Sequence, residues 1–335
     1  MTTRVAINGF GRIGRLFLRA SLLHPDLQVV AINDLTDPAT NAHLLKYDST
    51  QGRLAADVSL GNGGITVGDE TFKVLAERDP NNLPWKDMNV DVVIESTGRF
   101  TSREAASAHL NAGAKKVIIT TASNDADATF VVGVNENTYD AAAHHVVSNA
   151  SCTTNCFVPM VKVLDDAFGV DAGMMTTVHA YTNDQNLLDL THNDLRRARA
   201  AAINIVPAST GAARATSLVL SSMKGRLDGT GLRVPVPTGS ITDFTAIVRS
   251  VTVGEINAAF KAAADGPMKG IIVYTDEPIV SSDIVGSSAS CTFDSLMTMV
   301  QKIDDEKSLV KIFGWYDNEW GYSNRLVDLA RHIGK

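Results

Sequence analysis

One cysteine among small hydroxyl and amide side chains marks the segment best suited to covalent chemistry. Cys152 lies within Ser-Asn-Ala-Ser-Cys-Thr-Thr-Asn-Cys, residues 148–156, after a predicted strand and at the start of a predicted helix. Ser151 is a suitable N-cap, so Cys152 falls in the first turn, where unpaired N–H groups and the helix dipole favour an anion. Such surroundings lower a thiol pKa from about 8.5 toward neutrality. A core cysteine is the alternative, but the polar neighbours favour a nucleophile.

A histidine in the second half of the chain is the natural partner for this thiol. Residues 174–178 alternate as a strand does, and the strand is predicted to end at His179. A lone histidine is more often structural, and a nearby nucleophile gives it a catalytic role. A cysteine–histidine pair generates thiolate at neutral pH. Whether Cys152 and His179 are neighbours depends on the fold.

The N-terminal segment has the pattern of a dinucleotide-binding turn. A buried strand is predicted over 4–8, and Gly9, Gly11 and Gly14 lead from it into a helix. Gly9 permits the tight turn, Gly11 lets the backbone approach a pyrophosphate, and Gly14 lets the helix pack on the sheet. Asp34 ends the next strand about twenty residues later, where it can accept hydrogen bonds from a ribose and repel a 2′-phosphate. The pattern predicts NAD as the cofactor.

The strand and helix pattern continues beyond this turn. Buried strands are predicted over 91–95 and 116–119, with a helix over 102–111 between them. This alternation is typical of a doubly wound parallel sheet with right-handed crossovers. Residues 61–77 alternate differently and predict an inserted hairpin. The fold class is therefore α/β.

Several groups in the second half could hold small anions. The run 196–199 contains three arginines, which form either a solvated basic face or a binding site for an anion. Residues 209–213 open a helix with hydroxyl and N–H groups at its start. Arg233 lies in a strand-like run, where an unpaired charge is costly. Asn318 is the polar exception in an aromatic cluster that precedes an amphipathic helix, predicted over 323–333.

Length and composition narrow the class of protein. A chain of 335 residues, 44% hydrophobic and 20% charged, is typical of a globular protein with two domains. The net charge of −7 gives no basic field that would indicate a nucleic-acid or membrane partner. The start of the chain has no apolar signal region. Three cysteines argue against a disulfide framework and for a reducing, cytoplasmic location, and no zinc-ligand spacing or other metal site is found.

These segments together resemble phosphorylating glyceraldehyde-3-phosphate dehydrogenase, and the resemblance covers essentially the whole chain. Several of the matching segments are long and specific. They are Asn-Gly-Phe-Gly-Arg-Ile-Gly at 8–14, Lys-Tyr-Asp-Ser at 46–49, residues 148–156, His-Ala-Tyr-Thr at 179–182, Asp-Leu-Arg-Arg-Ala-Arg at 194–199, and residues 209–213 and 315–323.

The resemblance implies roles for individual residues. Cys152 corresponds to the nucleophile and His179 to its general base. The positions that correspond to the adenosine and pyrophosphate site of NAD are Gly9, Gly11, Arg12, Ile13, Asp34, Arg78 and Thr120, and Asn318 corresponds to the residue that binds the nicotinamide carboxamide. One phosphate subsite corresponds to Ser151, Thr153, Arg197, Thr210 and Gly211, and the other to Thr182 and Arg233.

The resemblance also implies an architecture and a reaction. Residues 1–151 and 318–335 are expected to form a Rossmann-type NAD-binding domain, and 152–317 an α+β catalytic domain, so that the C-terminal helix returns to the first domain. The expected assembly is a homotetramer. The expected substrates are D-glyceraldehyde 3-phosphate and inorganic phosphate, which become 1,3-bisphosphoglycerate through a thiohemiacetal and a thioester on Cys152 while NAD is reduced.

Three alternatives stay open at this point. Thr191 replaces the proline common in NAD-using relatives, and its hydroxyl could help bind a 2′-phosphate in an NADP-preferring isoform. Erythrose-4-phosphate dehydrogenase is the second alternative, because it resembles the same fold. Its relatives, however, lack the sequence Ala180-Tyr181-Thr182 and the pair Thr210-Gly211. A thiol redox sensor is the third, because Cys156 lies one helical turn from Cys152.

Overall fold

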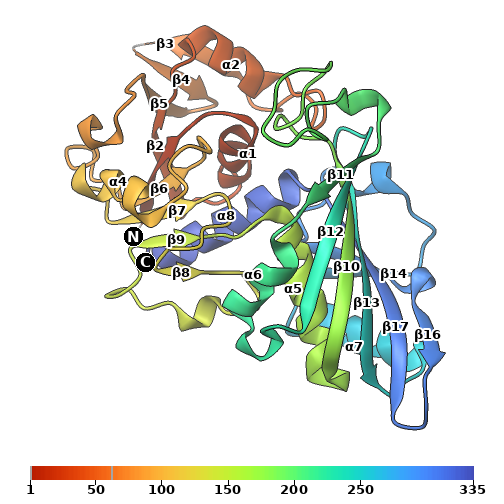
Figure 1. Cartoon of the computed structure of the whole chain (residues 1–335). Coiled ribbons are helices and arrows are strands. Elements are labelled where there is room, and N and C mark those ends of the chain that lie inside the picture. The colour runs from red at the N-terminus through yellow and green to blue at the C-terminus, as the bar shows by residue number, and fades with distance from the viewer. Residues whose placement is uncertain (1, 62) are drawn as a thin grey trace. The chain divides into compact units, whose positions relative to one another are not determined.

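The computed structural model describes residues 2–61 and 63–335, and the chain forms two compact units (Figure 1). The first unit comprises Met1–Val132, Glu136–Ser151 and Ser323–Lys335, and the second comprises Gly133–Asn135 and Cys152–Tyr322. Among the described residues, no helix has both the length and the apolar character needed to cross a membrane.

The first unit is built on a sheet that has nine strands among the described residues, in the order β3-β4-β5-β2-β1-β6-β7-β9-β8. From β5 to β8 all neighbouring strands run parallel. The central strands are continuous apolar runs because parallel strands are covered on both faces. The strands are β1 (Thr3–Asn8), β2 (Leu27–Asn33), β3 (Val58–Gly61), β4 (Gly64–Val67), β5 (Glu70–Leu75), β6 (Val92–Glu95), β7 (Lys116–Ile119), β8 (Ala128–Thr129) and β9 (Val146–Ser148).

The hairpin predicted over 61–77 is present as the antiparallel pair β4–β5, with Asn62 outside the described residues. Strand β5 also runs parallel to β2, so the hairpin extends the main sheet, which the sequence did not predict. The helices and 3-10 turns of this unit are α1 (Arg12–Ser21), α2 (Pro38–Lys46), η1 (Pro80–Asn82), α3 (Arg103–Ala106), α4 (Ala108–Asn111) and η2 (Glu136–Thr138).

Strand β1 is the point where the order of the sheet reverses, because β2 lies on one side of it and β6 on the other. The carboxyl ends of these strands, at Asn8, Asn33 and Glu95, therefore meet at one edge of the sheet. In open α/β sheets this edge is where ligands bind. The doubly wound parallel sheet predicted from the sequence is confirmed.

Helix α8 (Trp320–Ile333) begins three residues before its predicted start, and its residues from Ser323 onward belong to the first unit. Arg331 forms an ion pair with Asp26 at 2.8 Å, and the Thr3 hydroxyl donates to the carbonyl of Gly334 at 3.2 Å. The C-terminal helix thus returns to the unit that contains the N-terminal strand, as predicted.

The second unit has a mixed sheet in the order β11-β12-β10-β13-β17-β15-β14, and β16 pairs with β17. Helix α5 packs on this sheet. Its apolar residues Phe157, Val158, Val161 and Leu164 are buried, and the Phe157 ring stands edge-to-face on Phe244 at 4.9 Å. The strands are β10 (Val170–Ala180), β11 (Val206–Ser209), β12 (Leu227–Val234), β13 (Ser240–Arg249), β14 (Ile272–Thr275), β15 (Cys291–Asp294), β16 (Met299–Lys302) and β17 (Lys307–Tyr316). The helices and 3-10 turns are α5 (Cys152–Phe168), η3 (Ala201–Ile203), α6 (Ala212–Val219), η4 (Ser221–Met223), α7 (Val253–Asp265), η5 (Ser281–Ile284) and η6 (Ser295–Met297).

Candidate active site

A pocket of about 430 Å³ opens at the carboxyl edge of the first sheet, where β1, β2 and β6 end. Four residues predicted to bind the cofactor line it: Gly9, Gly11, Asp34 and Arg78. The sequence did not predict the other lining residues, although the positions after the buried strand 92–95 could have indicated two of them. These residues are Asn8, Asn33, Leu35, Glu77, Ser96, Thr97, Arg99 and Phe100.

The glycine turn has the shape that a pyrophosphate requires. Gly9 has φ of +92°, which a side chain would strain. A Cβ on Gly14 would lie 2.2 Å from the carbonyl oxygen of Gly9, so only glycine lets the helix pack there. A Cβ on Gly11 would meet no atom within 4 Å, which leaves open space beside the first turn of α1. That turn has no side-chain cap, so its N–H groups can receive an anion. The residues present fit a dinucleotide.

Asp34 ties this turn to the second strand. One carboxylate oxygen accepts the Phe10 N–H at 2.6 Å and the other accepts the Thr36 N–H at 2.8 Å. Each carboxylate oxygen has a further lone pair for a ribose hydroxyl. Its negative charge in the pocket opposes a 2′-phosphate.

Three predicted residues of the adenosine and pyrophosphate site do not line the pocket. The Arg12 guanidinium contacts Asp48 at 2.8 Å and Thr50 at 2.5 Å. Burial raises the pKa of Asp48, but the N–H groups of Gln51 and Thr50 and the charge of Arg12 outweigh burial and lower this pKa to about 2. The Thr120 hydroxyl donates to the carbonyl of Glu95, and Ile13 lies in the first turn of α1.

In the second unit, the Sγ atom of Cys152 lies 3.4 Å from Nε2 of His179. Helix α5 begins at Cys152, so the thiol occupies the first turn as predicted. His179 is the penultimate residue of β10 and pairs in register with Arg233 of the parallel neighbour β12. The fold thus brings together a thiol, an imidazole and a guanidinium from three elements.

The hydrogen bonds of His179 determine which ring nitrogen carries the proton. Nδ1 lies 2.7 Å from the carbonyl oxygen of Ala180, which can only accept. Nη1 of Arg233, which can only donate, lies 2.9 Å from Nδ1 and 3.0 Å from the same carbonyl. Because the carbonyl can accept the hydrogen of Arg233 as well, we assign the ring hydrogen to Nδ1, and Nε2 is then the base that faces Cys152.

Burial controls the protonation of this pair. Burial raises the pKa of the Cys152 thiol, while the charge of Arg233 and the N–H groups at the helix start oppose the rise. Burial and the charge of Arg233 lower the pKa of His179 to about 3. The predicted net lowering of the thiol pKa is wrong, because desolvation by burial outweighs the effect of the helix start. A neutral imidazole is nevertheless the species that can accept the thiol proton.

Tyr316 supports this pair and was not predicted. Its hydroxyl lies 2.8 Å from the hydroxyls of Thr153 and Thr177, and its ring stands edge-on to the His179 ring at 5.9 Å. Burial raises the pKa of Tyr316 well above its ordinary value, so it stays neutral. Its aromatic neighbours in the sequence indicated only a core residue.

The predicted anion groups lie in two sets. Arg233 is 3.4 Å from the Thr182 hydroxyl. Arg197 contacts Asp184 at 2.6 Å and the carbonyl of Ser209 at 3.3 Å, next to Thr210 and Gly211 at the start of α6. Burial lowers the pKa of Arg233, and the charge of Cys152 opposes this lowering. The positive charge of Arg197 adds to the lowering, so the charges of Arg197 and Arg233 are close enough to act on each other. Ser151 immediately precedes α5, and Thr153 follows Cys152 within it.

Asn318 lies in the turn between β17 and α8 and is 4% exposed. Its Oδ1 accepts hydrogen bonds from the Ser240 hydroxyl at 2.9 Å and the Gly239 N–H at 3.2 Å. The segment 238–240 therefore holds the amide of Asn318.

Comparisons with known proteins agree with these two sites. The model of glyceraldehyde 3-phosphate dehydrogenase, NAD binding domain, matches residues 3–103, and the model of its C-terminal domain matches residues 151–318. The chain is 61% identical to glyceraldehyde-3-phosphate dehydrogenase of Streptomyces coelicolor, over 100% of this chain and 99% of the relative. It is 60% identical to glyceraldehyde-3-phosphate dehydrogenase 2 of Streptomyces avermitilis over the same shares, and 58% identical to the glyceraldehyde-3-phosphate dehydrogenase of Geobacillus stearothermophilus, over 99% and 98%.

The chain belongs to the glyceraldehyde-3-phosphate dehydrogenase family. The resemblance inferred from the motifs is thereby confirmed. The NAD-binding model of the family spans the glycine turn and Asp34, so NAD is the cofactor, and the chain is an NAD-dependent dehydrogenase of this family. The C-terminal model of the family spans Cys152, His179 and Asn318.

Proposed function

We propose that the chain oxidises and phosphorylates D-glyceraldehyde 3-phosphate to 1,3-bisphosphoglycerate through a thiohemiacetal and a thioester on Cys152. The 3.4 Å approach of Cys152 Sγ to His179 Nε2 carries this proposal, because it sets a nucleophile against a free base. Family membership and the names of the relatives support the same substrate.

In the first step, Sγ of Cys152 bonds to the aldehyde carbon while Nε2 of His179 accepts the thiol proton. The imidazolium and the N–H of Cys152 stabilise the oxygen that becomes negative. The imidazolium of His179 gives its proton to this oxygen, which forms the thiohemiacetal hydroxyl. NAD, when bound, supplies the acceptor for the hydride that leaves the thiohemiacetal carbon. His179 takes the same proton back as the hydride leaves and the carbonyl re-forms, which leaves a thioester on Cys152.

In the second step, a phosphate oxygen attacks the thioester carbon and the C–S bond breaks. The acyl phosphate leaves, and the sulfur of Cys152 is released as a thiolate. The positive charge of Arg233 stabilises this thiolate. Substrate and acceptor both carry phosphate, so two anion subsites are needed. Ser151, Thr153, Arg197, Thr210 and Gly211 are proposed for one of them. Thr182 and Arg233 are proposed for the other.

For the cofactor, we assign Gly9, Gly11, Arg12, Ile13, Asp34, Arg78 and Thr120 to the adenosine and pyrophosphate end of NAD, and Asn318 to the nicotinamide carboxamide. Residues 1–151 and 318–335 are proposed as the NAD-binding domain, and residues 152–317 as the catalytic domain. The open space at Gly11 and the carboxylate of Asp34 in the pocket support the first assignment.

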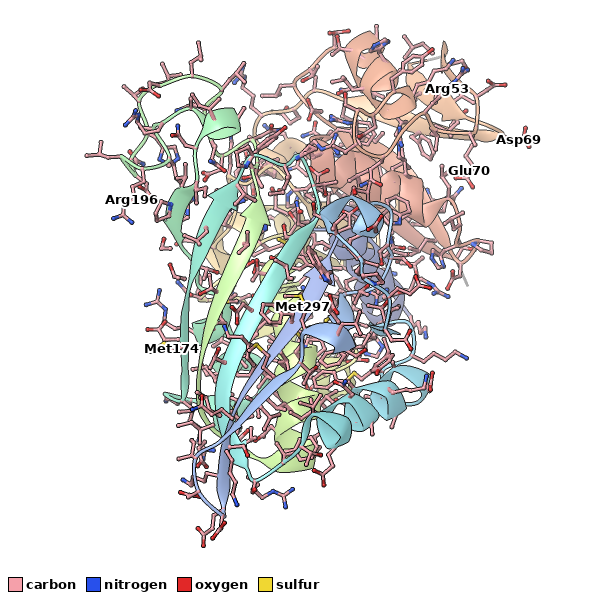
Figure 2. All side chains as sticks on the ribbon, turned by 90° about the vertical axis from the view of Figure 1, so that its right-hand side faces the viewer. Arg53, Asp69, Glu70, Met174, Arg196 and Met297 are labelled. Carbon is pink, nitrogen blue, oxygen red and sulfur yellow. The ribbon has the colours of Figure 1, made fainter. Side chains whose placement is uncertain are left out.

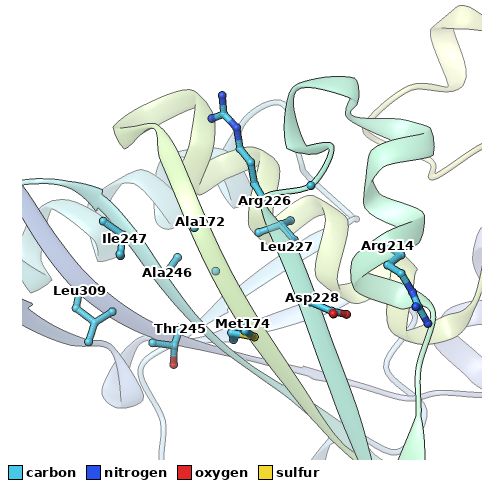
Figure 3. Close-up of a pocket in the computed structure, with 12 residues that line it drawn as sticks. Ala172, Met174, Arg214, Arg226, Leu227, Asp228, Thr245, Ala246, Ile247 and Leu309 are labelled. Carbon is cyan, nitrogen blue, oxygen red and sulfur yellow. The ribbon is translucent and has the colours of Figure 1, made fainter.

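A homotetramer is proposed from the apolar surface of the second unit. Large apolar side chains in 183–205 are exposed, among them Leu187 at 78% and Leu195 at 81%, and Arg196 projects from the same segment in Figure 2. Met174 projects from β10 with 69% exposure, and Figure 3 shows it beside Thr245 and Leu309 over a pocket on the sheet. Large apolar side chains exposed to this extent favour contact with other copies of the chain.

A cytoplasmic location is proposed because Cys152, Cys156 and Cys291 are all free thiols, as a reducing compartment keeps them.

Steady-state NADH formation tests the function. The chain is given glyceraldehyde 3-phosphate with NAD or NADP, each with and without inorganic phosphate. Rapid turnover is expected only with NAD and phosphate together. A clear preference for erythrose 4-phosphate, or equal turnover with NADP, would contradict the assignment. Cys152→Ser is expected to abolish turnover and keep NAD binding.

A further inference from the structure

The amide of Asn318 is held in one orientation by residues that precede and begin strand β13. The Gly239 N–H lies 3.2 Å and the Ser240 hydroxyl 2.9 Å from Oδ1 of Asn318. The Thr238 hydroxyl lies 3.0 Å from Oδ1 of Asp317, the residue before Asn318, and 3.4 Å from Oδ1 of Asn318 itself. The side chains of Thr238, Ser240, Asp317 and Asn318 are all buried.

Three donors set the orientation of the Asn318 amide. A backbone N–H can only donate, so the amide atom that faces Gly239 must be the oxygen. The Ser240 hydroxyl accepts the Ala180 N–H at 3.1 Å, and its own proton is therefore directed to Asn318. With the oxygen occupied, the NH₂ group of Asn318 points away from the turn. Among the described residues, this NH₂ group donates to none, and it is not sealed from solvent.

We propose that Ser240 is a positioning residue for cofactor recognition, because it holds the Asn318 amide so that only N–H donors face the ligand. This inference rests on the proposed role of Asn318 at the nicotinamide. The ligand group that Asn318 takes must then be a hydrogen-bond acceptor, and the carbonyl oxygen of the carboxamide meets that requirement. Ser240 also bonds to Ala180, which follows His179, so one hydroxyl links the base to the cofactor anchor.

Loss of the Ser240 hydroxyl removes the shortest of the three donor contacts to Oδ1 and leaves the longer ones from the Gly239 N–H and the Thr238 hydroxyl. The amide then turns over at a lower cost, and a larger fraction of it presents its oxygen to the ligand. NAD could still pair with a turned amide, through the NH₂ of its carboxamide. The 3-acetylpyridine analogue of NAD keeps the carbonyl oxygen and lacks that NH₂, so it can pair only with the native orientation. The ratio of the dissociation constant of the analogue to that of NAD therefore reports the orientation of the amide. General loosening of the fold would not change this ratio.

The test is calorimetric binding of NAD and of the acetylpyridine analogue to the full-length chain. Ser240→Ala is expected to weaken NAD about 3- to 10-fold, the effect of one hydrogen bond, and to weaken the analogue further, so that the ratio rises. Ser240→Thr keeps the hydroxyl and is expected to bring the ratio back toward that of the parent. Ser308→Ala is the matched control, because Ser308 is a buried serine that accepts the Val251 N–H at 3.2 Å at the other end of the sheet. If Ser240→Ala does not fold, the isosteric Ser240→Cys is measured, and its weak donor is expected to raise the ratio in the same direction.

An unchanged ratio in Ser240→Ala overturns the inference, whatever the absolute affinities. Asn318→Ala distinguishes the inference from the proposed function. If Asn318→Ala binds NAD as tightly as the parent, both the carboxamide role and the inference are wrong, although catalysis by Cys152 stands. If Asn318→Ala loses affinity and Ser240→Ala keeps the parent ratio, only the inference fails.

Discussion

Sγ of Cys152 lies 3.4 Å from Nε2 of His179, although 27 residues separate the two in the chain. One group opens a helix and the other nearly ends a strand, so both are held by regular backbone. The bond from Nδ1 to the Ala180 carbonyl leaves Nε2 as an acceptor for the thiol proton. Arg233 adds a positive charge that favours thiolate and disfavours imidazolium. The thiol proton of Cys152 can therefore pass to Nε2 of His179 as the sulfur attacks.

Removal of the Arg233 charge should make Cys152 less reactive. Because this charge lowers the pKa of the thiol, Arg233→Gln is expected to shift the pH profile of alkylation by neutral iodoacetamide to higher pH. At pH 7 the alkylation rate should fall, because a smaller fraction of Cys152 is thiolate when the positive charge is removed. Arg249→Gln, on an exposed arginine, is the control. An unchanged profile in Arg233→Gln would show that the guanidinium does not act on the thiol.

His179 should make the protein less stable in acid. Its pKa is about 3 in the folded chain and 6.5 when unperturbed, so between these pH values the unfolded chain binds the extra proton. The stability associated with His179 is complete above pH 6.5 and is lost as the pH falls toward 3, by at most about 1.4 kcal/mol per pH unit. His179→Asn should flatten this loss in urea unfolding between pH 7 and 4, whereas His43→Asn, at an exposed position, should not. Parallel profiles for His179→Asn and the parent would contradict the low pKa.

Alanine substitutions at two glycines of the cofactor turn should have different effects on stability and NAD affinity. A Cβ on Gly11 meets no atom of the chain, so Gly11→Ala should keep the thermal stability of the parent and lose NAD affinity. A Cβ on Gly14 would lie 2.2 Å from the Gly9 carbonyl, so Gly14→Ala should lose both. Calorimetric binding and thermal unfolding of the two variants check this. Tight NAD binding by Gly11→Ala would place the pyrophosphate elsewhere.

The core beside α5 should not tolerate a methyl group at Gly314. A Cβ there would lie 2.5 Å from Sδ of Met160 and 2.6 Å from Sγ of Cys291. Gly314→Ala is expected to reduce the free energy of unfolding by about 1–3 kcal/mol through overpacking. The cost should be smaller in a Cys291→Ala background, because that change removes one of the two contacts. An equal loss of unfolding free energy in the two backgrounds would rule out the contact with Sγ of Cys291 as a cause.

The first sheet could be predicted well from the sequence because its signals are local. Buried parallel strands are short apolar runs, and a strand, a glycine turn and a helix with Asp34 at the end of the next strand form a specific dinucleotide-binding pattern. The join between β5 and β2 was not predictable in this way, because it depends on strands far apart in the chain. The cofactor role of Arg12 stays a prediction, and the contacts of its guanidinium with Asp48 and Thr50 carried no local signal either.

The second unit shows where reasoning from motifs stops. The motif located the thiol at the start of a helix, but its pKa depends on burial by distant segments, and the predicted direction was wrong. Tyr316 and Ser240 carry no local signal, because a tyrosine among aromatic residues and a serine in a strand are ordinary. Their roles arise from hydrogen bonds to Thr177 and Asn318, which only the tertiary structure reveals.

A thioester on Cys152 that phosphate must release is the central claim, and a phosphate-free burst experiment tests it most directly. The chain is mixed with NAD and glyceraldehyde 3-phosphate without phosphate, while NADH absorbance and the intact mass of the protein are followed. The account predicts a burst of NADH equal to the concentration of Cys152 thiols, an acyl adduct on Cys152, and continued turnover only when phosphate is added. Sustained NADH formation without phosphate, or a burst with no adduct on Cys152, would contradict it.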